Sequence, residues 1–326
     1  MRESALRLLR CPNCRGELEV LAERERAADG HIMEGELGCK KGCRFEIVRG
    51  VPRLLPQGVA SESVETAARF GAEWQTWDHL GTYDEEWFRN WLDPVGPADF
   101  ADKTVFEGGC GKGRHTIIAA KWGVRDIVSV DLGVAAWVAF EHTRALENVH
   151  VVQADLCHPP VARGSFDLAF SVGVLHHLPE PRKGFDALAQ AVRRGGRLAI
   201  WVYGLESNEW IVRWVNPVRE KMTARMPPKL LYWLSLPPSA ALAAYVRLYK
   251  SDALAARLPY AAYMKRLAEI PLREVHSIVF DQLVTPIAYY LPEAEVRSWF
   301  NGGRFDDVQI AWHNQNSWRG CAVVRT

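Results

Sequence analysis

Apolar and β-prone positions recur in short runs between residues 100 and 204, and each run closes on a polar residue or a glycine. Five such runs are VFEG from 105, DIVSVDLG from 126, VHVVQADL from 149, FDLAFSVGVLHHL from 166 and GGRLAIWVYG from 195. Helical patterns such as RHTIIAAKW lie between them. Because strands that alternate with helices build a mostly parallel sheet, the pattern predicts a doubly wound α/β domain. The C-terminal runs DDVQIAW and WRGCAVVRT would extend the sheet to seven strands, and LPEAEVRSWFNGG predicts an amphipathic helix before them.

The first predicted strand leads into a glycine-rich turn. Glu107 precedes Gly109, Gly111 and Gly113, and a helical pattern starts directly afterwards. Such a turn leaves backbone N–H groups open, and glycines let a ligand approach the chain closely. A dinucleotide fingerprint would need a glycine in place of Arg114. An acid followed by G-x-G-x-G instead resembles motif I of the class I S-adenosylmethionine (SAM) methyltransferases, in particular the methyltransferase type 11-like group. The resemblance implies a Rossmann-like seven-stranded sheet and SAM as methyl donor.

Two further acids lie at successive strand ends. Asp131 stands 22 residues past Gly109, where a carboxylate can accept hydrogen bonds from ribose hydroxyls. In the resembled family an acid at the position of Asp155 receives the adenine amino group. Taken singly, each acid is as well explained as a surface residue, a helix N-cap or a turn former, and Cys110 is expected to pack rather than react. The resemblance implies these cofactor-binding residues: Glu107, Gly109, Gly111, Gly113, Asp131, Leu132, Asp155, Leu156 and Ser171.

Methyl transfer from a sulfonium mainly requires alignment of the nucleophile, and a general base helps when the nucleophile is a hydroxyl. His176 and His177 directly follow the fourth predicted strand and are the candidate catalytic residues. The alternative is that they only shape the pocket, because LHHL resembles a common sequence of the family. Further candidates are His276, Asp281, Tyr289, Tyr290 and His313.

Four of the seven cysteines lie within the first 43 residues, as the pairs Cys11/Cys14 (C-x-x-C) and Cys39/Cys43 (C-x-x-x-C). Two close pairs can place four thiolates tetrahedrally, as structural Zn²⁺ requires. Disulfides are the alternative. The remaining, isolated cysteines and the absence of a signal-peptide pattern in residues 1–10 favour a reducing, cytoplasmic location instead. The surrounding sequence resembles the Trm112-like zinc ribbon, and four cysteines would leave no open metal position for catalysis.

The sequence divides into four parts. We expect a zinc ribbon over 1–56, a linker and aromatic helical segment over 57–99, a SAM-binding core over 100–204 and 291–326, and a helical insertion over 205–290. The aromatic segment either lies over the cofactor mouth, as in methyltransferases with a similar FGAEW-type segment, or packs as an ordinary amphipathic helix. The insertion should lie at the carboxyl ends of the strands and act as a lid over a substrate pocket.

Part of this insertion is strongly apolar. Residues 230–249 hold one charge in twenty positions, a length that could span a membrane. Because Pro237 and Pro238 interrupt the stretch, we expect two buried helices joined by a turn. A lipophilic substrate or peripheral membrane contact stays open.

Charge and motifs narrow the choice of acceptor. The net charge is +1; residues 1–56 hold 11 basic and 9 acidic residues, and residues 204–290 hold 11 and 7. These mild excesses lack the dense basic stripe typical of RNA binding. Enzymes that methylate the exocyclic amines of bases carry N/D-P-P-Y/F after the fourth strand, where this sequence reads SVGVLHH. Cytosine C5 methyltransferases need a cysteine in the same region, and none is present there. Both nucleic-acid chemistries are therefore disfavoured. The aromatic insertion therefore favours a small, largely apolar or lipophilic acceptor.

Two alternatives to this acceptor remain. The first is a ribosomal or transfer RNA base methyltransferase that uses its zinc ribbon for RNA contact, because zinc-ribbon-plus-methyltransferase chains resemble ribosomal-RNA guanine N1 enzymes. The second is a non-catalytic binding protein with a methyltransferase-like fold. The intact motif I, together with Asp131 and Asp155, argues against the second.

Overall fold

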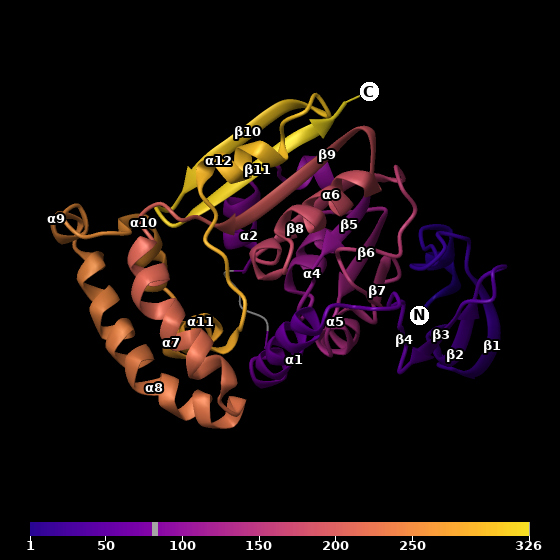
Figure 1. Cartoon of the computed structure of the whole chain (residues 1–326), viewed down its shortest axis with the longest axis horizontal. Helices are drawn as coiled ribbons and strands as arrows, with labels where there is room; N and C mark the ends of the chain where they lie inside the picture. Colours follow the sequence, from indigo (N-terminus) through magenta and orange to yellow (C-terminus); the bar gives the residue numbers. More distant parts are fainter. Residues whose placement is uncertain (80–83, 326) are drawn as a thin grey trace.

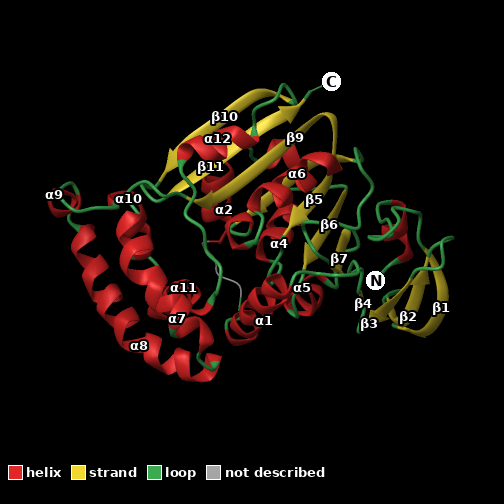
Figure 2. Ribbon diagram, viewed as in Figure 1, coloured by secondary structure: helices red, strands yellow, loops and turns green. Residues whose placement is uncertain are grey.

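A mixed seven-stranded sheet forms the centre of the molecule, and Figures 1 and 2 show its arrangement. The computed structural model describes residues 1–79 and 84–325. The strand order is β10-β11-β9-β8-β5-β6-β7. The strands are β5 (Thr104–Gly108), β6 (Asp126–Asp131), β7 (Val149–Gln153), β8 (Phe166–Val172), β9 (Val192–Tyr203), β10 (Phe305–His313) and β11 (Ser317–Val324). Strands β5 to β9 pair in parallel, whereas β11 runs antiparallel to β9 and β10. The predicted α/β class and the seven strands are thereby confirmed.

The central strands are apolar because both faces of the sheet are covered. Every residue of β5 and β7 is buried, as is usual where helices cover both sides of parallel strands. The connecting helices are α4 (Arg114–Lys121), α5 (Ala135–Thr143) and α6 (Pro181–Ala191), and α12 (Glu293–Trp299) precedes β10. Large side chains such as Phe106, Phe166 and Phe170 are fully buried. Burial of each contributes about 1.5–3 kcal/mol.

The N-terminal part is a small antiparallel sheet that packs against the central one. It contains β1 (Glu19–Arg26), β2 (Ile32–Gly38), β3 (Arg44–Val48) and β4 (Val51–Pro52). Its apolar residues Leu37 and Phe45 belong to the same buried cluster as Phe106 of β5. Arg15 donates hydrogen bonds to the carbonyl oxygens of Pro159 (2.7 Å) and Val161 (2.8 Å). The small sheet is thus held against the segment that follows β7.

Three helices connect this sheet to the core: α1 (Ser61–Thr76), α2 (Asp84–Leu92) and α3 (Pro97–Phe100). Phe88 of α2 anchors the segment, because its ring stacks on His115 (4.7 Å between centroids) and on Trp122 (5.1 Å) of the core.

The insertion after β9 is helical, as expected. Its α-helices are α7 (Asn216–Lys221), α8 (Pro228–Tyr245), α9 (Asp252–Ala255), α10 (Ala261–Leu267) and α11 (Leu272–Val284). Gly204 pairs with Leu291, so the insertion leaves and rejoins the core at one place. Figure 1 shows the insertion and the sheet β1–β4 at opposite ends of the long axis of the molecule.

The prediction of two buried helices over residues 230–249 is wrong. Residues 228–245 form the single helix α8, with Pro237 and Pro238 inside it. A proline removes the hydrogen bond to the carbonyl four residues earlier. Here those carbonyls belong to Trp233 and Leu234, two residues on the exposed side of the helix. One face of α8 is also open to solvent instead of buried.

Among the described residues, no helix is long and apolar enough to cross a membrane.

Candidate active site

The glycine turn after β5 has the backbone angles that its sequence predicts, but the prediction of open N–H groups is wrong for most of it. The N–H groups of Gly109 and Cys110 both donate to the carbonyl of Val130 (2.9 Å each), and that of Gly113 donates to the carbonyl of Cys110 (2.8 Å). Gly109, Gly111 and Gly113 all have positive φ angles, of 82°, 51° and 83°. A Cβ atom at Gly109 would lie 2.3 Å from Val174, and one at Gly111 would lie 3.1 Å from the indole nitrogen of Trp74. Larger residues would therefore be both strained and crowded at these positions. Helix α4 begins directly after the turn, at Arg114.

Asp131 and Asp155 lie beside this turn, at the carboxyl ends of neighbouring strands. The two carboxylate oxygens of Asp131 accept hydrogen bonds from the backbone N–H groups of Gly111 (3.0 Å) and Gly133 (2.9 Å). Burial raises the pKa of Asp131, and these two N–H groups oppose the rise. Asp155 accepts hydrogen bonds from the N–H of Cys157 (2.9 Å) and from Nδ1 of His158 (2.8 Å). Each oxygen keeps a lone pair for a further donor.

One cavity of about 650 Å³ joins these residues to the insertion. Six of the predicted cofactor residues line it: Gly109, Gly111, Asp131, Leu132, Asp155 and Leu156. The other three, Glu107, Gly113 and Ser171, lie outside its lining. The carboxylate of Glu107 accepts hydrogen bonds from the hydroxyls of Thr116 (2.5 Å) and Ser129 (2.7 Å) beneath the turn. The hydroxyl of Ser171 donates to the carbonyl of Gly108 (2.8 Å), and Gly113 allows α4 to approach Ala139 of α5. The geometry gives these three residues contacts that hold the turn in place.

Helix α1 forms a wall of the same cavity. Its residues Phe70, Glu73 and Trp74 line the space, together with Trp87 and Trp91 of α2. The ammonium group of Lys112 lies 5.3 Å from the centre of the Trp74 ring and donates to the carbonyl of Trp77 (2.9 Å). Of the two alternatives for the aromatic segment, the structure favours the one in which it lies over the glycine turn.

The two candidate histidines are buried and differ in position. His177 lines the cavity and donates from Nδ1 to the carbonyl of Ile287 (2.6 Å). Burial lowers its pKa to about 4, which makes it a weak proton acceptor at neutral pH. His176 lies outside the cavity lining and accepts a hydrogen bond at Nδ1 from the N–H of Tyr203 (3.4 Å). Burial also lowers the pKa of His176 well below its usual value.

A hydrogen-bonded chain of cavity residues offers a stronger base. The hydroxyl of Tyr203 donates to Asp281 (3.2 Å) and accepts from the side-chain amide of Gln282 (2.9 Å), whose oxygen accepts from Tyr290 (2.9 Å). All four residues line the cavity. Burial raises the pKa of Asp281 to about 6, and the Tyr203 hydrogen bond opposes that rise. Asp281 is therefore a carboxylate at neutral pH that holds a proton more tightly than an exposed one.

Glu73 is a second buried acid of the cavity. Burial raises its pKa well above the usual value, and the nearby Asp281 charge raises it further. Its Oε1 accepts a long hydrogen bond from Ser277 (3.4 Å), and Oε2 has no partner among the described residues. The sequence analysis missed Glu73, although an acid inside the aromatic run FGAEW was a usable signal.

The remaining candidates lie elsewhere. His276 is hydrogen-bonded to Ser235 (2.8 Å) and to the carbonyl of Tyr232 (3.1 Å), within the insertion. Neither His276, Tyr289 nor His313 lines the cavity.

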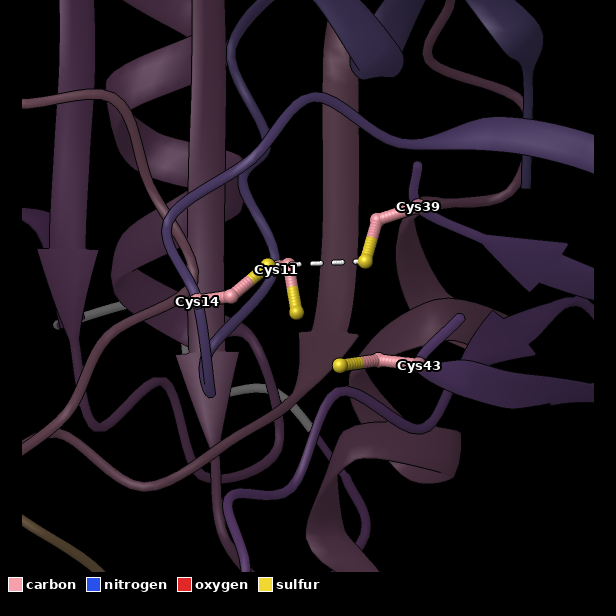
Figure 3. A group of neighbouring side chains, drawn as sticks. All are labelled: Cys11, Cys14, Cys39 and Cys43. Carbon is pink, nitrogen blue, oxygen red and sulfur yellow. Dashed lines mark hydrogen bonds between the residues drawn. The ribbon is translucent and has the colours of Figure 1, made fainter. Parts of the chain in front are cut away.

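The four N-terminal cysteines converge at one point, as Figure 3 shows. Their Sγ atoms all lie within 4.8 Å of one another, and those of Cys14 and Cys39 are 3.4 Å apart. Four thiolates on a tetrahedral Zn²⁺ have Zn–S distances of about 2.3 Å, so their sulfurs are separated by roughly 4 Å. The cluster fits such an ion.

Comparison with known proteins agrees with this geometry. The profile of the family described as "Methyltransferase domain" matches residues 106–200. A tRNA U34 carboxymethyltransferase of Marinobacter nauticus is 34% identical over 133 residues, 38% of this chain and 39% of that protein. The enzyme of the same name from Methylococcus capsulatus is 28% identical over 192 residues, 55% of this chain and 59% of that protein. The chain thus spans less than two thirds of these relatives.

Solved structures give weaker likenesses. A SAM-dependent methyltransferase from Aquifex aeolicus has a TM-score of 0.43 at 14% identity, covering 78% of this chain and 98% of that one. A complex of the Haloferax volcanii Trm112 methyltransferase activator with a methyltransferase has a TM-score of 0.43 at 12% identity, covering 79% and 98%.

Proposed function

We propose that this chain, whose core is a class I SAM-dependent methyltransferase domain, transfers a methyl group from SAM to an acceptor bound beneath its helical insertion. The observation that carries the proposal is the continuity of the cavity. A single space reaches from Gly109, Asp131 and Asp155 at the sheet edge to Tyr263 and Asp281 of the insertion. A donor at one end and an acceptor at the other would meet inside a space shielded from bulk water.

The residues around the glycine turn fit the donor. The carboxylates of Asp131 and Asp155 would hold its adenosyl part, because both acids retain lone pairs for hydroxyl or amino donors. The glycines of the turn would let the donor approach the chain closely. SAM supplies a methyl group that is already activated on a sulfonium. The protein is then left to align the acceptor with it and to exclude water.

Asp281 is the residue best placed to take the acceptor proton. Its pKa of about 6 keeps it ionised at neutral pH while leaving it more basic than an exposed aspartate. Tyr203 orients the carboxylate, and Gln282 in turn orients Tyr203. This base would act on a hydroxyl or a protonated amine of the acceptor.

The lining on the insertion side favours an acceptor with an apolar body. Aliphatic residues of the insertion line this space: Ile211, Val215, Leu242, Leu267 and Ile270. Desolvating apolar atoms against them would contribute about 25 cal/mol per Å². The lead candidate is therefore a small, largely apolar or lipophilic molecule with one nucleophilic group near Asp281.

A tRNA base is the second candidate, and the names of the relatives favour it over a small acceptor. A base flipped out of its stack could use the aromatic walls of the cavity, at Tyr263 and Tyr290 for example. The sheet β1–β4 lies at the far end of the molecule from the insertion (Figure 1). An RNA that touched both would have to run along the core.

A methyl-transfer assay with radiolabelled SAM decides between the two acceptors. One arm offers total tRNA and ribosomal RNA, and the other offers a lipid and small-molecule extract. A small apolar acceptor predicts label in the organic phase with little effect of salt. An RNA held through about six or more phosphate contacts would instead lose roughly a thousandfold in affinity when the salt concentration rises from about 50 to about 200 mM. Label in tRNA with that steep salt dependence would overturn the lead candidate in favour of the second.

We also propose that Cys11, Cys14, Cys39 and Cys43 hold a structural Zn²⁺. The support is the convergence of four sulfurs, which would fill all four positions of a tetrahedral Zn²⁺. Because the cluster lies away from the cavity, this ion would stabilise the small sheet and take no part in the reaction.

A further inference from the structure

Helix α8 exposes an unusually apolar face. Leu230, Trp233 and Leu234 are exposed on its first half, Tyr245 is exposed at its end, and Leu248 is exposed in the turn that follows. Trp233 alone has 67% of its surface accessible. Spacings of three and four residues place these side chains on one side of a helix. Figure 1 shows α8 along the outer edge of the insertion, at the end of the molecule farthest from β1–β4.

The opposite face of α8 is packed inside the insertion. Leu231, Ser235 and Ser239 are buried, and α8 packs against α11. Pro238 and Leu242 line the cavity. The exposed stripe is therefore not needed for packing within the described chain.

A second stripe lies on the preceding helical segment. Trp210, Trp214, Val218 and Met222 recur every four residues and are all exposed, with Trp214 at 65%. The guanidinium of Arg213 lies 5.0 Å from the Trp214 ring centre. Helix α7 of this segment also packs against α11.

Between Glu220 and Asp252 the charges have a single sign. Residues 221–250 contain five basic residues and no aspartate or glutamate. These are Lys221, Arg225, Lys229, Arg247 and Lys250, and all are exposed. None of the five forms an ion pair with any residue that the structure describes. The whole chain, by contrast, is nearly neutral at +1.

We infer that the outer face of α8 is a docking surface for a lipid bilayer that carries anionic headgroups. Tryptophan and leucine on one face, flanked by unpaired lysines and arginines, are the chemistry of a helix lying in the membrane interface. Each basic residue near an anionic surface contributes about 1 kcal/mol. An RNA or a second copy of the chain would each satisfy only one half of this pattern. RNA would complement the basic residues but offers no apolar surface to the leucines. A second copy of the chain would place two positively charged faces against each other.

This surface is separate from the donor site, and the inference does not depend on methyl transfer. Because Leu242 of the same helix lines the cavity, docking would place the acceptor end of the cavity near the bilayer.

Co-sedimentation with vesicles tests the inference, using the full-length chain without donor or acceptor. Vesicles of phosphatidylcholine alone are compared with equimolar phosphatidylcholine and phosphatidylglycerol. We expect binding to the anionic vesicles that weakens with added salt. Trp233→Ala should weaken it about tenfold or more, and Lys229→Ala or Lys250→Ala about fivefold each. Leu21→Ala on β1 and Lys121→Ala on α4 are matched controls with exposed side chains that should leave binding unchanged.

A second measurement separates docking from loss of fold. Brominated acyl chains should quench tryptophan fluorescence in the wild-type protein. The variant Trp233→Phe should still bind but lose much of this quenching, because phenylalanine keeps the apolar contact. Three results would each overturn the inference: equal weakening by the control variants, absence of binding to anionic vesicles, or a concentration-dependent dimer that Trp233→Ala abolishes. Binding of tRNA that Lys229→Ala weakens, without vesicle binding, would do the same.

Discussion

The hydroxyl of Tyr203 donates a hydrogen bond to the carboxylate of Asp281 across 3.2 Å, although 78 positions separate the two residues in the sequence. Tyr203 ends strand β9, and Asp281 belongs to α11 of the insertion. The pair therefore joins the sheet edge to the lid at the place where donor and acceptor would meet. It also gives the insertion a chemical role beyond covering the cavity.

Asp281→Asn should lower kcat by about 10²–10⁴-fold and leave the Kd for SAM unchanged, because the amide keeps the shape but cannot accept a proton. In the wild-type protein the base must be ionised, and burial raises its pKa to about 6. Activity should therefore be lost as the pH falls through about 6. The pH profile of kcat/KM and calorimetric titration of SAM check both points.

Tyr203→Phe supplies the companion measurement. The lost hydrogen bond is one that lowers the pKa of Asp281, so the acid limb of the profile should move to higher pH. Tyr289→Phe, which alters a residue outside the cavity lining, is the control and should not move it. A profile that stays fixed in Tyr203→Phe would remove Asp281 from the proposed role.

Asp131→Ala should weaken SAM by about 1–3 kcal/mol, because a buried charged acceptor is lost. The structure adds a second reason: one carboxylate oxygen holds the glycine turn through Gly111, and the other holds the loop after β6 through Gly133. Calorimetry gives the affinity, with Glu147→Ala as an exposed control. Unchanged affinity in a folded Asp131 variant would contradict the assignment.

The glycine turn and the acids at the strand ends could be predicted because their signals are local. Gly109, Asp131 and Asp155 each follow an apolar run, and parallel strands bring their carboxyl ends together without further information. Glu73, Tyr203 and Asp281 come from three distant segments, and only the packing of α1 and α11 over the sheet unites them. The open face of α8 was missed for a different reason. An apolar run is normally buried, and nothing in its own sequence shows that α11 covers only one side.

Glu107→Gln should remove a pH-dependent cost to stability. Burial raises the pKa of Glu107 to about 7 in the folded protein, despite hydrogen bonds from Thr116 and Ser129 that lower it. An acid whose pKa is raised by folding binds more protons in the folded state than in the unfolded state. Its ionised form destabilises the folded protein, so this loss of stability is absent below the pKa of the unfolded state and complete above about 7. The variant should thus gain stability relative to wild type as pH rises from about 5 to about 8, by up to a few kcal/mol. Urea unfolding at both pH values measures it, and the exposed Glu147→Gln should show no such trend.

Purified protein should carry about one zinc per chain, and Cys14→Ser should lose it. Three thiolates and a hydroxyl make a poorer site, so the small sheet should loosen. Its cluster with Leu9 and Phe45 keeps it against the core, however, and the donor residues lie on the turn after β5 and at the ends of β6 and β7. SAM affinity should therefore remain largely intact in this variant. Cys157→Ser, outside the cluster, should retain the metal. Elemental analysis and calorimetry on protein prepared without chelator provide the readout, and a wild-type preparation free of zinc would refute the proposed site.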